Sequence, residues 1–147
     1  MRVVDVKAEL TKLKMFEGRT PTANERRDSL SALLPYRDGA VFVAKFAGKS
    51  AWERHPQGDE IVHIVEGKTT LHLITAEGRH RLALKAGMLV VVPQNAWHQF
   101  EAPEGVSVLT ATPQPTQHLA IDADDPRAGG GGASDESPAV TRGEIRQ

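Results

Sequence analysis

The sequence contains no cysteine and a single tyrosine, Tyr36. The absence of cysteine excludes disulfide bonds, cysteine-bound iron–sulfur clusters and thiol nucleophiles, and it agrees with the cytoplasmic location that we expect. The charges nearly balance, with 18 Lys and Arg against 19 Asp and Glu, so we expect neither a nucleic acid nor a membrane as a partner. No apolar run is long enough to span a bilayer, and charges interrupt the first residues, so a signal peptide is not expected either.

The 147 residues suffice for one domain with a hydrophobic core. We expect an N-terminal extension over residues 1–37 that packs on the domain or on a partner subunit, a barrel over 38–112, and a C-terminal extension over 113–147. That last extension should be largely disordered from about residue 126, because four consecutive glycines and mixed polar residues bury too little apolar surface to offset the entropy of ordering.

The N-terminal extension shows two leucine groups, at residues 10–13 and 30–34, which predict two short helical or irregular pieces. Thr22 or Asn24 could cap another short helix through residues 25–28.

From residue 39 onward, short apolar and β-branched runs alternate with turn residues. The runs cover residues 41–46, 61–65, 69–75, 79–84, 89–92, 97–100 and 106–111. Glycines and Pro-containing turns separate them, and no helix-length amphipathic pattern interrupts the series. This pattern predicts short strands joined by tight turns, in an all-β barrel or sandwich over residues 38–112.

A group of carboxylates and imidazoles stands out within this region. Glu53 and His55 alternate on an extended segment, so their side chains should project to the same face. After a Pro-Gln-Gly turn, Glu60 opens the next strand and can point into the same space. Such a convergence indicates either metal binding or acid–base chemistry.

This stretch resembles the first motif of the cupin superfamily, which reads His-x-His, three or four residues, Glu, six residues, Gly. Here the chain has Glu53-x-His55, four residues, Glu60, six residues and Gly67. The spacing matches, but a glutamate stands where the first histidine is usual.

A later stretch resembles the second cupin motif, which reads Gly, five residues, Pro-x-Gly, two residues, His. The chain has Gly87, five residues, Pro93-x-Asn95, two residues and His98. Asn95 replaces the usual glycine. Because Asn is the side chain that best tolerates a positive φ, we expect the turn to be preserved.

The resemblance implies a double-stranded β-helix, or jelly-roll, barrel that holds one divalent metal ion. The implied ligands are His55, Glu60 and His98, with Glu53 as a fourth ligand or, if it is free, as a catalytic base. A competing interpretation is that Glu53 pairs with a nearby Arg and binds nothing. Two imidazoles with carboxylate oxygens favour Fe or Mn, while Zn or Ni would also bind. Parity along the strands predicts an apolar substrate pocket, with candidates Phe42, Phe46, Val62, Ile64 and Phe100.

The remaining histidines should serve other roles. His63 has the opposite parity to Glu60 and should point away from the site, whereas His72 could face either way. His80 and His118 lie near turns or near the chain end. We expect all four of these histidines to be ordinary surface or interface residues.

Several apolar side chains have outward parity. Trp52 and Trp97 should pack against the N-terminal segment or a second subunit. Ile61 and Val65 make the strand that begins at Glu60 apolar on both faces, which needs cover on both sides. A homodimer, which the resemblance to cupins implies, would supply this cover.

The residues and the resemblance together favour a metal-dependent, dioxygenase-like oxygenase acting on a small metal-chelating organic substrate. A metal-dependent isomerase or lyase is an alternative, but it needs a positioned acid and base, for which only Tyr36 or His72 are candidates. A non-catalytic module that binds a metal or a small ligand is the third possibility.

Overall fold

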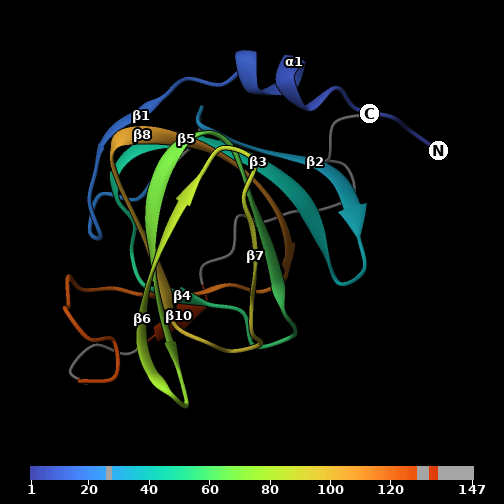
Figure 1. Ribbon diagram of the computed structural model, residues 1–147. Helices are drawn as coiled ribbons and strands as arrows, with labels where there is room; N and C mark the ends of the chain where they lie inside the picture. The colour runs from blue at the N-terminus through green and yellow to red at the C-terminus, as the bar shows by residue number, and fades with distance from the viewer. Residues whose placement is uncertain (26–27, 129–132, 136–147) are drawn as a thin grey trace.

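The computed structural model describes residues 1–25, 28–128 and 133–135, and these form one short helix and a curled ten-stranded β-sheet (Figure 1). The elements are α1 (Val6–Thr11), β1 (Phe16–Arg19), β2 (Leu30–Tyr36), β3 (Gly39–Lys49), β4 (Glu53–Arg54), β5 (Glu60–Thr75), β6 (Gly78–Lys85), β7 (Leu89–Val92), β8 (His98–Pro113), β9 (Gln117–Leu119) and β10 (Ala133–Asp135). The predicted all-β barrel is confirmed. Within the described residues, no helix is long and apolar enough to cross a membrane.

Two long strands, β5 and β8, organise the barrel. Each has 16 residues, and they pair with one another in antiparallel fashion over most of their length. β8 also pairs with β3, while β5 carries β6 and β7. The sheet therefore wraps around a central core rather than lying flat.

The turns predicted near Gly67 and Gly105 are wrong, because both residues lie inside these long strands. Gly67 is opposite Val106, and register shifts flank it on both sides. The two glycines have φ angles of 77° and 96°, and a Cβ on Gly67 would collide with the carbonyl oxygen of Gly105. Bulges of this kind bend a strand through a corner without ending it. The runs at residues 61–65 and 69–75 therefore belong to one bent strand, β5. The runs at residues 97–100 and 106–111 likewise belong to one bent strand, β8.

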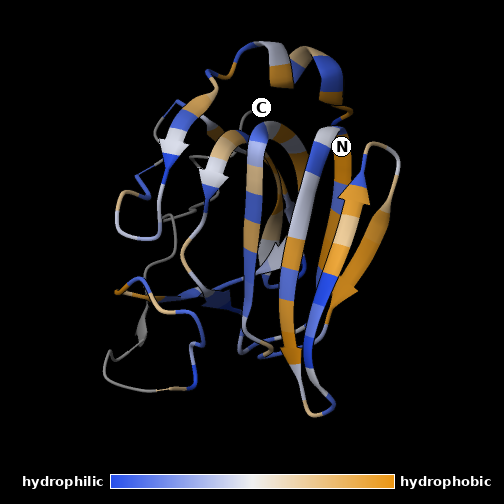
Figure 2. Cartoon of the chain, turned by 60° about the vertical axis from the view of Figure 1, so that its left-hand side comes forward, coloured by the Kyte–Doolittle hydropathy of each residue, from blue (hydrophilic) through white to orange (hydrophobic). Residues whose placement is uncertain are grey.

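The central core lies between the layers and is formed by side chains of alternating parity, a pattern visible along the strands in Figure 2. Its buried members are Ala44, Phe46, Val62, Ile64, Leu71, Leu73, Val92, Phe100, Ala102, Val106 and Val108. Each large side chain of this kind contributes about 1.5–3 kcal/mol when fully buried. This core sets the positions of the strand ends that carry the polar site.

The N-terminal residues pack on the outer face of the barrel. Asp5 caps α1 by accepting a hydrogen bond from the Ala8 amide at 3.0 Å, and Leu10 packs with Leu33 and Val43. The prediction of a helical or irregular piece at residues 30–34 is wrong, because that segment is β2. Antiparallel pairing with β3 supplies its backbone hydrogen bonds, and this tertiary pairing overrides the local helix propensity of leucine.

The short helix predicted over residues 25–28 falls partly on residues 26–27, outside the described part of the chain. Its described members Glu25 and Asp28 are not helical.

The C-terminal residues cover Trp52, which is fully buried with Ile74 and Leu119. Its indole Nε1 donates to the carbonyl oxygen of Ala123 at 2.8 Å. The cover predicted from the N-terminal segment or a second subunit thus comes from the chain's own C-terminal segment. Most of the predicted disordered tail, residues 129–132 and 136–147, lies outside the described residues, whereas 133–135 form β10 against β9.

An apolar patch remains exposed on the outer face of β5 and β7. It consists of Ile61, Leu89 and Val91, which are 38%, 60% and 51% exposed, and Ile61 lies directly opposite Val91 in the sheet. Val65 is partly buried beside α1 and needs no further cover.

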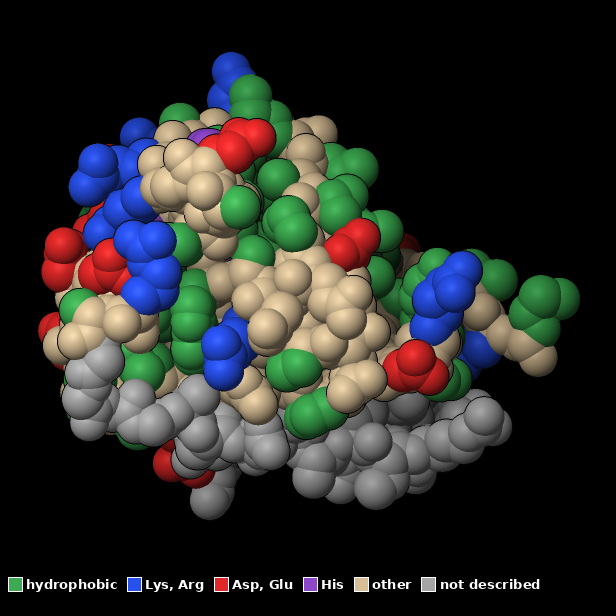
Figure 3. Space-filling model, turned by 90° about the horizontal axis from the view of Figure 1, so that it is seen from below, with side chains coloured by type: hydrophobic (Ala, Val, Ile, Leu, Met, Phe, Trp, Pro, Cys, Tyr) green, Lys and Arg blue, Asp and Glu red, His purple; other side chains and the backbone are tan. Residues whose placement is uncertain are grey.

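The surface seen from below carries charged side chains. Lys and Arg gather along one side of it, with acidic side chains among them (Figure 3).

Candidate metal centre

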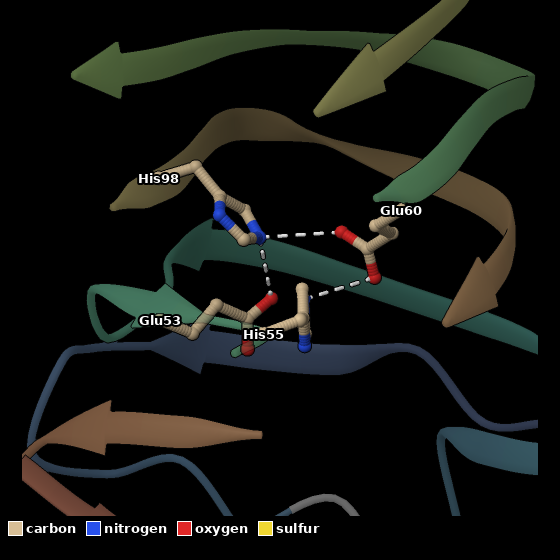
Figure 4. A group of neighbouring side chains, drawn as sticks. All are labelled: Glu53, His55, Glu60 and His98. Atoms are coloured by element: carbon tan, nitrogen blue, oxygen red, sulfur yellow. Dashed lines mark ion pairs between the residues drawn. The ribbon is translucent and has the colours of Figure 1, made fainter. Parts of the chain in front are cut away.

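Four side chains with metal-binding chemistry converge inside the barrel (Figure 4). Glu53 lies on β4, which pairs with β8 so that Glu53 is directly opposite His98. Glu60 begins β5, and His55 belongs to the turn between these strands. One potential ligand atom from each of the four residues lies within 4.8 Å of all the others, and all four residues are buried.

Hydrogen bonds hold the two motif turns against each other. The backbone N–H of Asn95 donates to the His55 carbonyl oxygen at 3.0 Å. Gln94 donates from its side chain to the Pro56 carbonyl oxygen and from its backbone to Asp59, both at 2.7 Å. Asn95 has a φ of 62°, as predicted for the position where glycine is usual. The backbone therefore fixes the relative positions of the ligand-bearing turns.

The distances between the polar atoms match those around a bound ion. His98 Nε2 lies 3.2 Å from Glu60 Oε1 and 3.4 Å from Glu53 Oε1. His55 Nε2 lies 3.2 Å from Glu60 Oε2. Ligand atoms about 2.1 Å from a metal are separated by about 3.0 Å at right angles and about 3.4 Å at tetrahedral angles.

Several of these atoms lack other partners. Among the described residues, His55 Nε2, Glu60 Oε1 and His98 Nε2 are buried without a hydrogen bond. The Nδ1 atom of His98 lies 3.0 Å from the Ala96 carbonyl oxygen. Because a carbonyl only accepts, Nδ1 must carry a proton. Once the proton on Nε2 is lost, the ring presents its Nε2 lone pair to the space between the carboxylates. A cation between these atoms would satisfy all of them, so the donor set fits a divalent metal.

Three of the four residues are also contacted by a side chain outside the cluster, which we call an outer partner. Thr112 donates to Glu60 Oε2 at 2.6 Å, and Thr116 Oγ1 lies 2.9 Å from His55 Nδ1. His118 Nε2 lies 3.1 Å from Glu53 Oε2. Such contacts orient metal ligands and select the ring tautomer of histidines.

The charges of the site stabilise one another. Burial raises the pKa of both carboxyls, but the neighbouring imidazoles outweigh burial, holding the pKa of Glu53 well below its usual range and lowering that of Glu60 to about 2. Burial alone would lower the pKa of His98, yet Glu53 and Glu60 raise it to about 10. Without metal, the site thus holds two carboxylates that attract a positive charge.

A small cavity of about 50 Å³ adjoins the cluster. Its apolar lining residues include the predicted Phe42, Phe46 and Phe100, whereas Val62 and Ile64 lie in the hydrophobic core instead. The lining differs from the apolar pocket that we expected, because it also contains four polar residues. These are Thr110, Thr112, Gln114 and Thr116.

The structure also places the other candidates. Within the part of the chain that the structure describes, Glu53 pairs with His98 and His118 and not with an Arg. His72 and His118 are buried within the chain, so the prediction of surface or interface residues is wrong for both. His72 lies away from the cavity, where its Nε2 is 3.0 Å from Glu101 Oε1. His63 is partly buried between the inward-facing Val62 and Ile64, and so points outward as predicted.

Sequence reasoning missed the outer partners Thr112, Thr116 and His118. A signal for the first was present, because Val106, Val108, Thr110 and Thr112 keep one parity along β8. The other two follow the end of β8 and offered no comparable pattern.

Residues 41–111 match the family model of the cupin domain. The chain carries a cupin domain. This confirms the resemblance shown by the two motifs, and the match covers all four residues of the cluster. No match was found among curated proteins.

Solved structures of similar fold include other cupins. A cupin-2 domain protein of Shewanella frigidimarina is 20% identical with a TM-score of 0.56, covering 76% of this chain and 95% of that one. A protein of Neisseria meningitidis is 19% identical with a TM-score of 0.56, covering 77% and 100%. A hydroquinone 1,2-dioxygenase of Sphingomonas sp. TTNP3, with 4-hydroxybenzoate bound, is 20% identical with a TM-score of 0.52, covering 63% and 70%. At these identities the likeness concerns the fold.

Proposed function

We propose that this cupin is a metal-dependent oxygenase, of dioxygenase type, that acts on a small metal-chelating organic substrate. The observation that carries the proposal is the cluster of two imidazoles and two carboxylates whose unpartnered atoms face one another beside an aromatic-lined cavity. Sites with two histidines and a carboxylate are typical of Fe(II) oxygenases.

In this proposal His55, Glu60 and His98 hold the metal, and Glu53 is the fourth ligand. A divalent, redox-active ion in this position would supply Lewis acidity and electron transfer to O₂. The protein contributes the orientation of the ligands, through Thr112, Ala96 and the two motif turns. Phe42, Phe46 and Phe100 line the cavity and give it an apolar wall, and displacement of water by a bound substrate would strengthen electrostatic interactions there.

The similarity in fold to a hydroquinone 1,2-dioxygenase is compatible with this chemistry. The alternative of an isomerase or lyase has less support, because neither Tyr36 nor His72 lines the cavity. Glu53 would then be the remaining candidate base, and its contact with His98 instead favours a role as ligand.

The test is oxygen uptake by Fe(II)-reconstituted protein with a panel of catechols, β-diketones and hydroxy acids. We expect uptake with at least one class for the parent protein and for His63→Ala, a control that removes an outward-facing histidine. His98→Ala should show none, because it removes a ligand. No uptake by protein with a filled iron site would refute the oxygenase proposal. A metal-dependent rise in the unfolding midpoint without any turnover would favour a binding module instead.

A further inference from the structure

We propose that the cavity selects small chelators that bind as neutral molecules or monoanions, and that it discriminates against dianionic acids. This inference rests on the proposed function and narrows its substrate class. It follows from the charge, the polar lining and the size of the cavity.

Among the described residues, the cavity lining contains carboxyl groups but neither lysine nor arginine. Of these lining residues, Glu53 and Glu60 carry carboxyl groups and His55 carries an imidazole. Arg19 lies 4.4 Å from the centroid of the Phe46 ring, but it does not line the cavity. His118 contacts Glu53 and also lies outside the lining.

The described part of the lining therefore offers an anionic substrate no lysine or arginine, and its positive charge comes from the metal. Two carboxylate ligands offset the two charges of a divalent ion, so the loaded site has no surplus positive charge. A dianion would bring two uncompensated charges into a buried space, where desolvation costs several kcal/mol per ion. A neutral molecule or a monoanion avoids most of this cost.

The uncharged polar residues of the lining suit such a molecule. Thr110 and Gln114 lie near the aromatic residues and present a hydroxyl and an amide. The Gln114 Oε1 atom is buried and has no hydrogen-bond partner within the described residues. A substrate with a hydroxyl or N–H group could satisfy this amide, and no charge is required for that contact.

The size and rigidity of the cavity restrict the substrate further. The volume of about 50 Å³ is small, and Phe46 and Phe100 pack edge to face with centroids 5.7 Å apart. Such rings are held by their packing in the core. We therefore expect compact bidentate oxygen ligands, such as a hydroxamate or a small β-diketone.

The test compares acetohydroxamate with oxalate, two small bidentate chelators that differ in charge. Binding to the Co(II)-loaded protein is measured from the visible spectrum, with the cobalt content checked after each titration. Each affinity is divided by the affinity of the same chelator for aqueous Co(II). We expect the normalised affinity for acetohydroxamate to be at least about tenfold higher, since like-charge juxtaposition costs several kcal/mol. Equal values, or a preference for oxalate, would overturn the proposal.

Gln114→Lys provides a second arm, because it adds an ammonium group to the lining. The normalised preference should shift toward oxalate in this variant. Gln114→Met, an uncharged control of similar length, should give a much smaller shift, because it removes only the amide contact and adds no charge. An unchanged preference in Gln114→Lys would contradict the electrostatic origin of the selection.

The outcome separates this inference from the oxygenase proposal. Charge selection without oxygen uptake by the iron-loaded protein would refute the oxygenase activity only. Oxygen uptake with dianionic acids as the preferred substrates would refute the selection only.

Discussion

Replacing Thr112 by valine tests whether Glu60 is a metal ligand oriented by its outer contacts. The Thr112 hydroxyl donates to Glu60 Oε2 at 2.6 Å, and both residues are buried. Valine keeps the shape of the side chain and replaces only the hydroxyl with a methyl group. Without that hydrogen bond the carboxylate loses one of the contacts that fix its orientation, and metal binding must then supply part of the ordering.

The expected effect follows from the strength of this hydrogen bond. A hydrogen bond to a charged group contributes about 1.5–3 kcal/mol, and about 1.4 kcal/mol corresponds to a factor of ten in affinity. Thr112→Val should therefore weaken metal binding by about 10- to 100-fold, the range typical for removing an outer-shell partner.

The assay is competition between the protein and a chromophoric chelator for Co(II) or Zn(II). Thr110→Val is the matched control, because the Thr110 hydroxyl lies 2.7 Å from the Thr112 hydroxyl, whereas Glu60 accepts its hydrogen bond from Thr112. It removes a neutral hydrogen bond and should cost less than about tenfold. An unchanged metal affinity in Thr112→Val, with native secondary structure and unfolding temperature, would refute the reasoning.

Four further predictions concern the site and the surface. His98→Ala should lose bound metal, because it removes a buried ligand; metal analysis of untagged protein checks this, and equal content in variant and parent would exclude the proposed site. Metal affinity should rise about tenfold per pH unit between about pH 6 and 9. The reason is that the metal must displace the proton that a pKa of about 10 keeps on His98. Calorimetry measures this affinity, and an affinity that does not change with pH would contradict the prediction. The folding stability of the metal-free protein should instead fall as the pH rises. Its raised His98 pKa stabilises the fold fully below the ordinary value of 6.5, and this contribution is lost as the pH rises toward 10; denaturant titrations at several pH values measure it. Leu89→Asp should convert a dimer to a monomer in light scattering, because it places a charge in the exposed apolar patch, and a monomeric parent protein would refute the predicted homodimer.

The local sequence was sufficient to predict short strands and to place three of the candidate ligands together, and the resemblance to the cupin motifs added His98. Alternation places Glu53 and His55 on one face, and the turn after His55 returns the chain to Glu60. Asn95 has the positive φ that its place in the turn required. These features depend on a few neighbouring residues, so they can be read without knowing the rest of the fold.

The environment of the site depends on contacts between segments far apart in the chain. Glycines at 67 and 105 gave no indication whether the chain turns or bends, because only the pairing of β5 with β8 decides between a turn and a bulge. β2 is a strand because β3 completes its hydrogen bonds.

The C-terminal segment shows the same dependence most clearly. His118 lies 63 positions beyond His55 in the sequence, yet β9 pairs with β4 and brings it to Glu53. Alternation and spacing thus determined which side chains could bind a metal. Only the tertiary structure decided which groups orient them and which groups line the cavity, because strand pairing between distant segments places those residues.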